Sequence, residues 1–233
     1  MRRFIVCVAL LLVASTLVAA EPKAIENVDT DAFTSDTQVT PTGAGDDHVA
    51  LVWWIPIEFW ESIMARDKNV GVAEKQAMLG AMSGTSLLVV VQADTTQTGA
   101  FKFYGKDEIE EDLSLTYTDG DGQARQLSPV QNVNPTLATV LGIFKPILGN
   151  AMGNMGNNMH FYVLDDRGPA DRLIDPYKEG TLQIDLVKRD GTDMTAELEF
   201  PLNCLFVPRK CPNGRDAHIS WEYCPWTGKK LDD

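Results

Sequence analysis

The residues with the clearest capacity for chemistry lie in the last 30 positions of the chain. Cys204, Cys211 and Cys224, three of the four cysteines, are found there together with His218. Thiolate and imidazole are ligand types that zinc prefers. Two neighbouring thiols can alternatively form a disulfide in an oxidising compartment. We call residues 204–233 the tail, and it is the first candidate for a site.

Two short motifs in the tail resemble the knuckles of the zinc ribbon family. They are residues 211–214 (CPNG) and 224–228 (CPWTG). In that family, two knuckles of the form Cys-Pro-x-Cys-Gly each give two thiolates to one tetrahedral metal. Here Gly214 and Thr227 stand where the second cysteines would be, so each knuckle keeps only one thiol. The resemblance therefore implies a degenerate ribbon without the four-thiolate site.

The resemblance leaves two ways in which the remaining cysteines of the tail could be cross-linked. The first is a disulfide between Cys211 and Cys224, since thiolates that share a metal lie close together; the bond would contribute roughly 3 kcal/mol in the chain-entropy model. The second is a zinc site rebuilt from Cys204, Cys211, His218 and Cys224, whose spacings match no standard ribbon. An exported protein favours the disulfide, which leaves Cys204 as a buried thiol and requires no cofactor.

A second cluster combines thioethers with an imidazole: Met152, Met155, Met159 and His160. These ligand types suit copper(I), and on one continuous helix the three methionines would share a face. The alternative is that the methionines are soft filler for a protein core. We favour the core interpretation, because methionine is common in protein interiors.

An aromatic group near the start of the folded part consists of Trp53, Trp54, Phe59 and Trp60. The three tryptophans could form the floor of a ligand groove. Such a group more often anchors a helix on a sheet, and we prefer that interpretation.

Signals for catalysis are weak elsewhere in the chain. It has no Gly-x-Ser-x-Gly elbow, no His-Glu-x-x-His motif and no phosphate-binding glycine loop. The acidic run at residues 108–112 is typical of a solvated surface. No catalytic residue is assigned, and an enzyme stays the third hypothesis.

The first 20 residues predict export. Arg2 and Arg3 precede an apolar run at 4–18, which contains Cys7, and small residues up to Ala20 suit a signal peptidase. A membrane-spanning helix needs roughly 20 apolar residues, so this run is short for an anchor. We expect cleavage after Ala20, a periplasmic or extracellular mature protein, and no membrane span once the signal is removed. The alternative is an uncleaved anchor.

Composition limits the partners. The formal net charge of −13 would repel phosphate backbones, so nucleic-acid binding is disfavoured. A hydrophobic content of 44% is ordinary for a globular protein. The 233 residues suffice for one good-sized domain with appendages.

The signal and the tail are separated by two expected regions. Residues 21–47 are rich in Thr, Asp and Glu without periodic apolar positions, which predicts a flexible acidic linker. Residues 48–203 are expected to form the folded domain. Pro146 should kink or split the longest helical segment in it. The expected helical segments are residues 56–65, 73–82 and 135–158.

About seven short strands with intervening turn signals are expected after residue 83. Asp-Gly pairs within 119–122 and 189–192 predict two hairpins. Over roughly residues 84–203 the pattern resembles the immunoglobulin-like domains of exported bacterial proteins. That resemblance implies a mainly β fold with inserted helices (α+β): an immunoglobulin-like antiparallel β-sandwich with short N-terminal helices, a helical insertion and a small ribbon-like tail.

These features favour a non-enzymatic binding or assembly module of the bacterial cell envelope. Its partner would be an unknown envelope protein or a small ligand. The alternative is a periplasmic protein that handles zinc or copper through the Cys/His tail or the Met/His cluster. An unrecognised hydrolase is the third hypothesis, and analogy of fold alone does not decide among the three.

Overall fold

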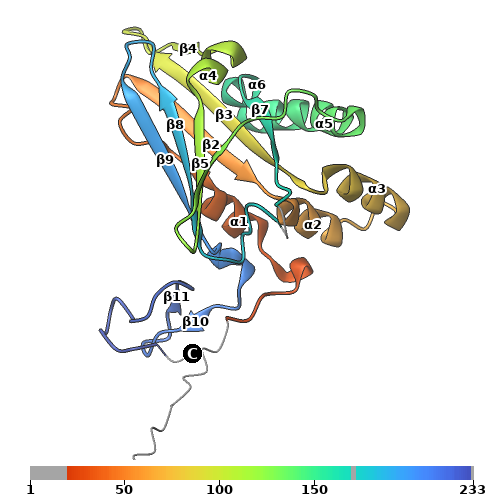
Figure 1. Cartoon of the computed structure of the whole chain (residues 1–233), viewed down its shortest axis with the longest axis vertical. Helices are drawn as coiled ribbons and strands as arrows, with labels where there is room; N and C mark the ends of the chain where they lie inside the picture. The colour runs from red at the N-terminus through yellow and green to blue at the C-terminus, as the bar shows by residue number, and fades with distance from the viewer. Residues whose placement is uncertain (1–19, 169–171, 232–233) are drawn as a thin grey trace, which may run out of the picture.

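A computed structural model describes residues 20–168 and 172–231, so nearly all of the predicted signal peptide lies outside the described residues. The described chain is a mixed α+β fold with antiparallel sheets, as expected for its class. Figure 1 shows two larger sheets, helices along one side of them, and the tail at one end. Within the described ranges, no helix has the length and apolar character needed to cross a membrane.

The helices agree well with the two short helical segments that were expected. The helical elements are η1 (Ile25–Asn27), α1 (Thr30–Thr37), α2 (Ile57–Arg66), α3 (Val72–Met82), α4 (Lys106–Asp112), α5 (Pro135–Met152), α6 (Asn154–Asn157) and η2 (Asn203–Leu205). The strands are β1 (Gln38–Val39), β2 (His48–Ile55), β3 (Thr85–Thr95), β4 (Phe101–Phe103), β5 (Ser114–Asp119), β6 (Ala124–Leu127), β7 (His160–Asp165), β8 (Gly180–Val187), β9 (Asp193–Phe200), β10 (Arg209–Lys210) and β11 (Asp216–Ala217).

Strand β3 is the centre of the five-stranded sheet. One of its edges pairs with β2, which in turn pairs with β1. Along its other edge, residues 85–90 pair with β7 and residues 93–95 pair with β4. The four-stranded sheet has the order β6-β5-β8-β9 and contains both predicted hairpins. Strands β10 and β11 form a small separate ladder in the tail.

The five-stranded sheet is the middle of three layers. Most of β3 is buried on both faces, whereas β8 buries only alternate residues. Neighbouring residues of β2 point to opposite faces and show what covers each one. The Trp53 ring lies 5.4 Å from that of Phe59 in α2, and the Trp54 ring lies 5.1 Å from that of Phe200 in β9. Helices therefore cover one face and the four-stranded sheet covers the other (Figure 1).

The tryptophans predicted as a possible groove floor are core residues, so the groove interpretation is wrong. Trp53, Trp54 and Trp60 are all buried. The indole N–H of Trp53 donates to Thr37 at 3.1 Å, and that of Trp54 donates to Ser86 at 3.0 Å. With their polar atoms satisfied inside the protein, these rings anchor the layers to one another.

Residues 21–47, predicted as a flexible linker, are folded against the body. Asp29 caps α1 by accepting two backbone N–H groups of the first helical turn. Val28 and Phe33 occupy the N′ and N4 positions of a hydrophobic staple, and both are buried in the main core. The prediction failed because a staple needs only two apolar residues, which a composition rich in Thr and Asp conceals.

The long helical insertion breaks at a glycine and not at the proline. Helix α5 continues through Pro146, which is exposed together with Gly142, so the carbonyl that loses its helical partner can be hydrated. The chain turns at Gly153, whose φ of 58° favours glycine, and α6 then folds back on α5. At Gly156 a Cβ would lie 2.1 Å from the Leu148 carbonyl oxygen, so this close approach requires glycine.

Phe33→Ala tests whether the segment before residue 48 belongs to the fold. Removing a fully buried ring should lower the free energy of unfolding by about 3–5 kcal/mol, measured by urea denaturation. The matched control is Phe101→Ala, whose ring is exposed on β4 and whose loss should change stability by less than about 1 kcal/mol. Equal stabilities of the two variants would restore the linker interpretation.

Candidate functional site

The two knuckle motifs form two tight turns that face one another. In the first, the Gly214 N–H donates to the Cys211 carbonyl at 2.8 Å, and Gly214 has a φ of 81°. In the second, the Gly228 N–H donates to the Cys224 carbonyl, also at 2.8 Å. The turn following each cysteine therefore needs its glycine, although the matching second thiols are missing.

The turns bring Cys211 and Cys224 into contact. Both side chains are buried and belong to one small cluster with Ala217 and Leu231. All three described cysteines are free thiols in this structure. Burial raises the pKa of Cys211 to about 11, and its hydrogen bond to Cys224 adds to that rise.

Cys224 has the opposite character. Burial opposes its ionisation, but hydrogen bonds from the Cys211 thiol, from the Thr227 hydroxyl and from the backbone N–H groups of Trp226 and Thr227 outweigh it. They lower the pKa of Cys224 to about 7. The pair therefore combines one thiol that ionises near neutral pH with one that stays protonated there.

The other two members of the predicted zinc set lie elsewhere. Cys204 belongs to the main core, where its N–H donates to Asp36 at 2.7 Å. Burial raises the pKa of the Cys204 thiol, and Asp36 adds to the effect. His218 shares a hydrogen bond with Ser220 at 2.8 Å. In the described ranges no group of three or more His, Cys, Asp or Glu residues is placed to hold a metal ion.

The Met/His cluster is dispersed, which removes the geometric basis of the copper interpretation. Met152 ends α5 and is exposed, Met155 lies in α6, and Met159 follows it and is fully buried. The expectation of one helical face was wrong because the break at Gly153 separates them. The Nε2 atom of His160 lies 3.0 Å from the Tyr104 carbonyl oxygen, so the imidazole already has a protein partner.

Aromatic side chains are exposed on the outside of the tail. Trp221 and Trp226 are 36% and 47% exposed, and their rings meet edge to face at 5.7 Å. The Arg215 guanidinium lies 5.0 Å from the centroid of the Trp226 ring. We call these three residues the aromatic patch. Tyr223, at 55% exposure, lies close to them in sequence.

A partly buried arginine, Arg209, holds the loop that carries Trp221. The Nη2 group of Arg209 donates to three carbonyl oxygens in this loop, those of His218, Ile219 and Trp221. The Ile219 N–H in turn donates to Asn203 of η2 at 3.0 Å, which ties the loop to the body. The position of the aromatic patch is thus fixed from both the tail and the body.

A groove with a cavity volume of about 1220 Å³ separates the tail from the body. Its floor includes the ends of β5, β8 and β9, and Trp221 forms part of its tail side. Tyr177 and Phe206, whose rings are 5.7 Å apart, supply further aromatic surface. Residues 20–22 also line it, because Pro22 forms a bridge with Phe206.

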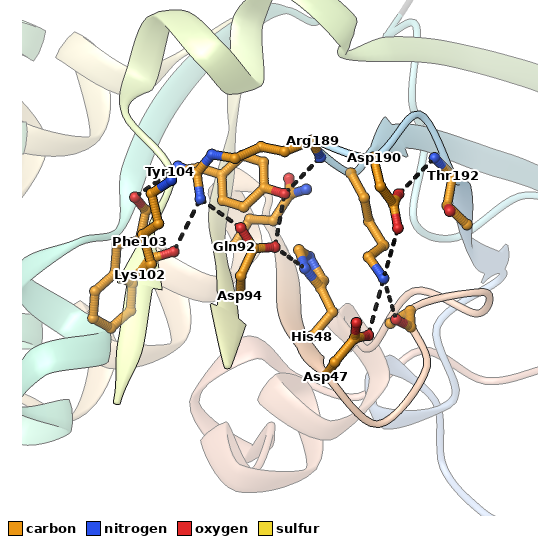
Figure 2. Close-up of polar contacts among 12 residues, drawn as sticks. Asp47, His48, Gln92, Asp94, Lys102, Phe103, Tyr104, Arg189, Asp190 and Thr192 are labelled. Carbon is orange, nitrogen blue, oxygen red and sulfur yellow. Dashed lines mark hydrogen bonds and ion pairs between the residues drawn. The ribbon is translucent and has the colours of Figure 1, made fainter. Parts of the chain in front are cut away.

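A polar cluster at the opposite end of the sheets contains the only His–Asp pair that the described residues show. The Nδ1 atom of His48 lies 2.9 Å from Asp94, which also accepts from the Tyr104 hydroxyl at 3.0 Å and from Arg189 at 2.6 Å (Figure 2). Burial disfavours the Asp94 carboxylate, yet these hydrogen bonds hold its pKa below the ordinary value. His48 is buried, and its Nε2 atom has no hydrogen-bond partner among the described residues.

Arg189 organises this cluster. Its guanidinium donates to Asp94, to both carboxylate oxygens of Glu108, and to the carbonyls of Lys102 and Phe103, which uses all five donors. It also stacks 3.8 Å above the Tyr104 ring. Since Arg189 follows β8 and its partners lie on β3, β4 and α4, the cluster joins the two sheets.

Sequence reasoning missed this cluster for a definite reason. Arg189 lies within a predicted hairpin turn, and Glu108 lies within an acidic run that was interpreted as a solvated surface. Neither local pattern indicates a partner about 80 residues away in the chain, such as Arg189 for Glu108. The one signal in the sequence was the position of His48, which directly precedes the apolar run at 49–55.

Comparison of the chain with protein-family models, with curated proteins and with solved structures finds no significant match.

Glu108→Gln tests the Arg189 cluster through its pH dependence. Hydrogen bonds from Arg189 lower the pKa of Glu108 from 4.5 to about 2. Because the folded-state pKa lies below the unfolded one, this contribution to stability is present above the unfolded pKa and is lost as the pH falls through about 2. Urea unfolding at stepped pH should show a steeper acid loss for the native chain than for Glu108→Gln.

The control for this experiment is Glu111→Gln, an exposed position on the same helix. It should keep the steep acid loss of the native chain. If Glu108→Gln and the native chain instead lose stability in parallel, the Arg189–Glu108 pair does not stabilise the fold.

Proposed function

We propose that this chain is a non-enzymatic binding module of the bacterial cell envelope, and that it binds an acidic, extended segment of a partner protein through the aromatic patch and the groove. The single observation that carries the proposal is the patch itself, in which two tryptophans and an arginine are exposed together on the surface of the tail. Exposed Trp and Arg side chains are the residue types that dominate binding energy at protein interfaces.

Charge favours an acidic partner. The segment 209–231 carries five basic and two acidic side chains, a net charge of +3, in a chain whose net charge is −13. Lys229 and Lys230 are exposed, as is Arg215 of the patch. A locally positive surface on an acidic protein attracts anionic segments to one place and repels them elsewhere.

The groove supports an extended ligand. It leads from the tail along the ends of three strands, and Trp221 belongs both to it and to the aromatic patch. The groove is lined by five acidic and three basic side chains, so the acidic part of a bound segment would lie on the positive tail and a neutral part would continue past Trp221 into the groove. If the signal is cleaved after Ala20, the new amino group of Glu21 would add a positive charge at the groove, because Glu21 is among its lining residues.

Export and the immunoglobulin-like form of the two-sheet body are parts of the same proposal. The N-terminal apolar run supports export. The antiparallel strands and two hairpins support the immunoglobulin-like form, whose scaffolds commonly carry binding surfaces at the ends of their sheets. The proposed groove lies at such an end.

Peptide titration followed by tryptophan fluorescence tests the proposal. A glutamate-rich peptide should bind and change the emission of the exposed tryptophans, whereas a lysine-rich peptide of the same length should not. Trp226→Ala and Arg215→Ala should each weaken binding about ten-fold or more, because they remove the ring or the charge of the aromatic patch.

The matched control is Phe101→Ala, which removes an exposed ring far from the tail in sequence. It should leave peptide affinity unchanged. Equal binding of the acidic and basic peptides, no binding of either one, or unaltered affinity in Trp226→Ala would refute this assignment of the binding surface.

A further inference from the structure

Residues 209–231 of the tail have very little core of their own. Their buried apolar side chains are Cys211, Ala217, Cys224 and Leu231, which form a cluster separate from the main core. Four side chains of this size bury too little area to hold 23 residues, 209–231, in one conformation. Small units of this kind are usually held by a disulfide or a metal ion.

The arrangement of ligands leaves the pair of sulfurs as the only cross-link that the described tail can supply. Two free thiols share this cluster, and no third His, Cys, Asp or Glu among the described residues completes a metal site with them. Zinc in a structural site takes four protein ligands, so two thiols alone do not suffice. Two thiols in contact do suffice for a disulfide.

The surroundings of the sulfurs suit the formation of a disulfide. The thiolate is the form that attacks a disulfide, and the lowered pKa of Cys224 favours that form. Cys211 is buried in the same small cluster as Cys224, so the second sulfur lies close enough to complete the exchange. Cys204 is separated from both, since it is buried in the main core next to Asp36.

We propose that Cys211 and Cys224 are a covalent modification site: a disulfide joins them in the exported protein and clamps the two knuckle turns, while Cys204 stays a free thiol. This inference does not depend on the acidic partner proposed above. It rests on the contact of the two sulfurs, on their isolation from other ligands and on the small core around them.

The chemistry balances with a dithiol oxidase of the envelope as oxidant. During folding, before Leu231 covers the sulfurs, the Cys224 thiolate attacks the oxidase disulfide and releases one oxidase thiolate. The Cys211 thiol then loses its proton and attacks the mixed disulfide at the Cys224 sulfur. The S–S bond of the tail forms, the second oxidase sulfur leaves, and the oxidase gains both electrons and both protons.

The bond would also fix the aromatic patch. Trp226 lies two residues after Cys224, in the second turn, and its ring contacts Arg215, which follows the first turn. The patch therefore spans both turns, and a bond between Cys211 and Cys224 limits their relative movement. Reduction should loosen the patch without unfolding the body, whose core does not include the pair.

Intact mass and thiol alkylation of the full chain, expressed with its N-terminal signal in a host with an oxidising envelope, test the proposal. The purified protein should weigh two hydrogens less than its reduced form. After denaturation one thiol should react, and peptide mapping should place it at Cys204. Three reactive thiols, or a bond that includes Cys204, would overturn the proposal.

Variants separate the bond from folding defects. Cys204→Ala should keep the loss of two hydrogens, whereas Cys211→Ser and Cys224→Ser should each abolish it. Cleavage of the tail by trypsin after Arg215 should become about ten-fold or more faster on reduction of the native chain, and should not change on reduction of Cys211→Ser. Equal cleavage rates of the oxidised and reduced native chain would show that the bond does not clamp the tail.

Discussion

The contact between the sulfurs of Cys211 and Cys224 is the interaction on which the outer end of the molecule depends. It lies within a four-residue cluster; the exposed Trp226 lies in one of the two turns around it, and Arg215 directly follows the other. A cluster so small cannot define a surface through apolar burial alone. Whatever holds the two sulfurs together therefore also holds the aromatic patch together.

The body is stabilised differently from the tail, because its central strands are buried on both faces. Trp53 and Trp54 fasten the middle sheet to the helices and to the second sheet, and Arg189 ties the second sheet to β3, β4 and α4 at the far end. The tail joins this rigid unit through Asn203 and Arg209. The groove lies at that junction, so its shape depends on both parts.

Elements with a strong local signal could be predicted from the sequence, and those that depend on distant partners could not. The two Asp-Gly turns place the two hairpins correctly. The capped helix at Phe33 was missed because two apolar residues carry it, and Arg189 was missed because its partners come from three other elements. The tail motifs predicted the meeting of Cys211 and Cys224, but not the exposed patch beside them, since exposure depends on the packed body.

Hydrogen–deuterium exchange of the tail amides, compared between the oxidised and the reduced protein, tests the central claim most directly. The N–H groups of Gly214 and Gly228 donate to the carbonyls of the two cysteines and report on the two turns. The account predicts that both amides are protected in the oxidised protein and exchange about ten-fold or more faster after reduction, while amides of β3 stay protected. Unchanged protection of Gly214 and Gly228 after reduction would contradict it.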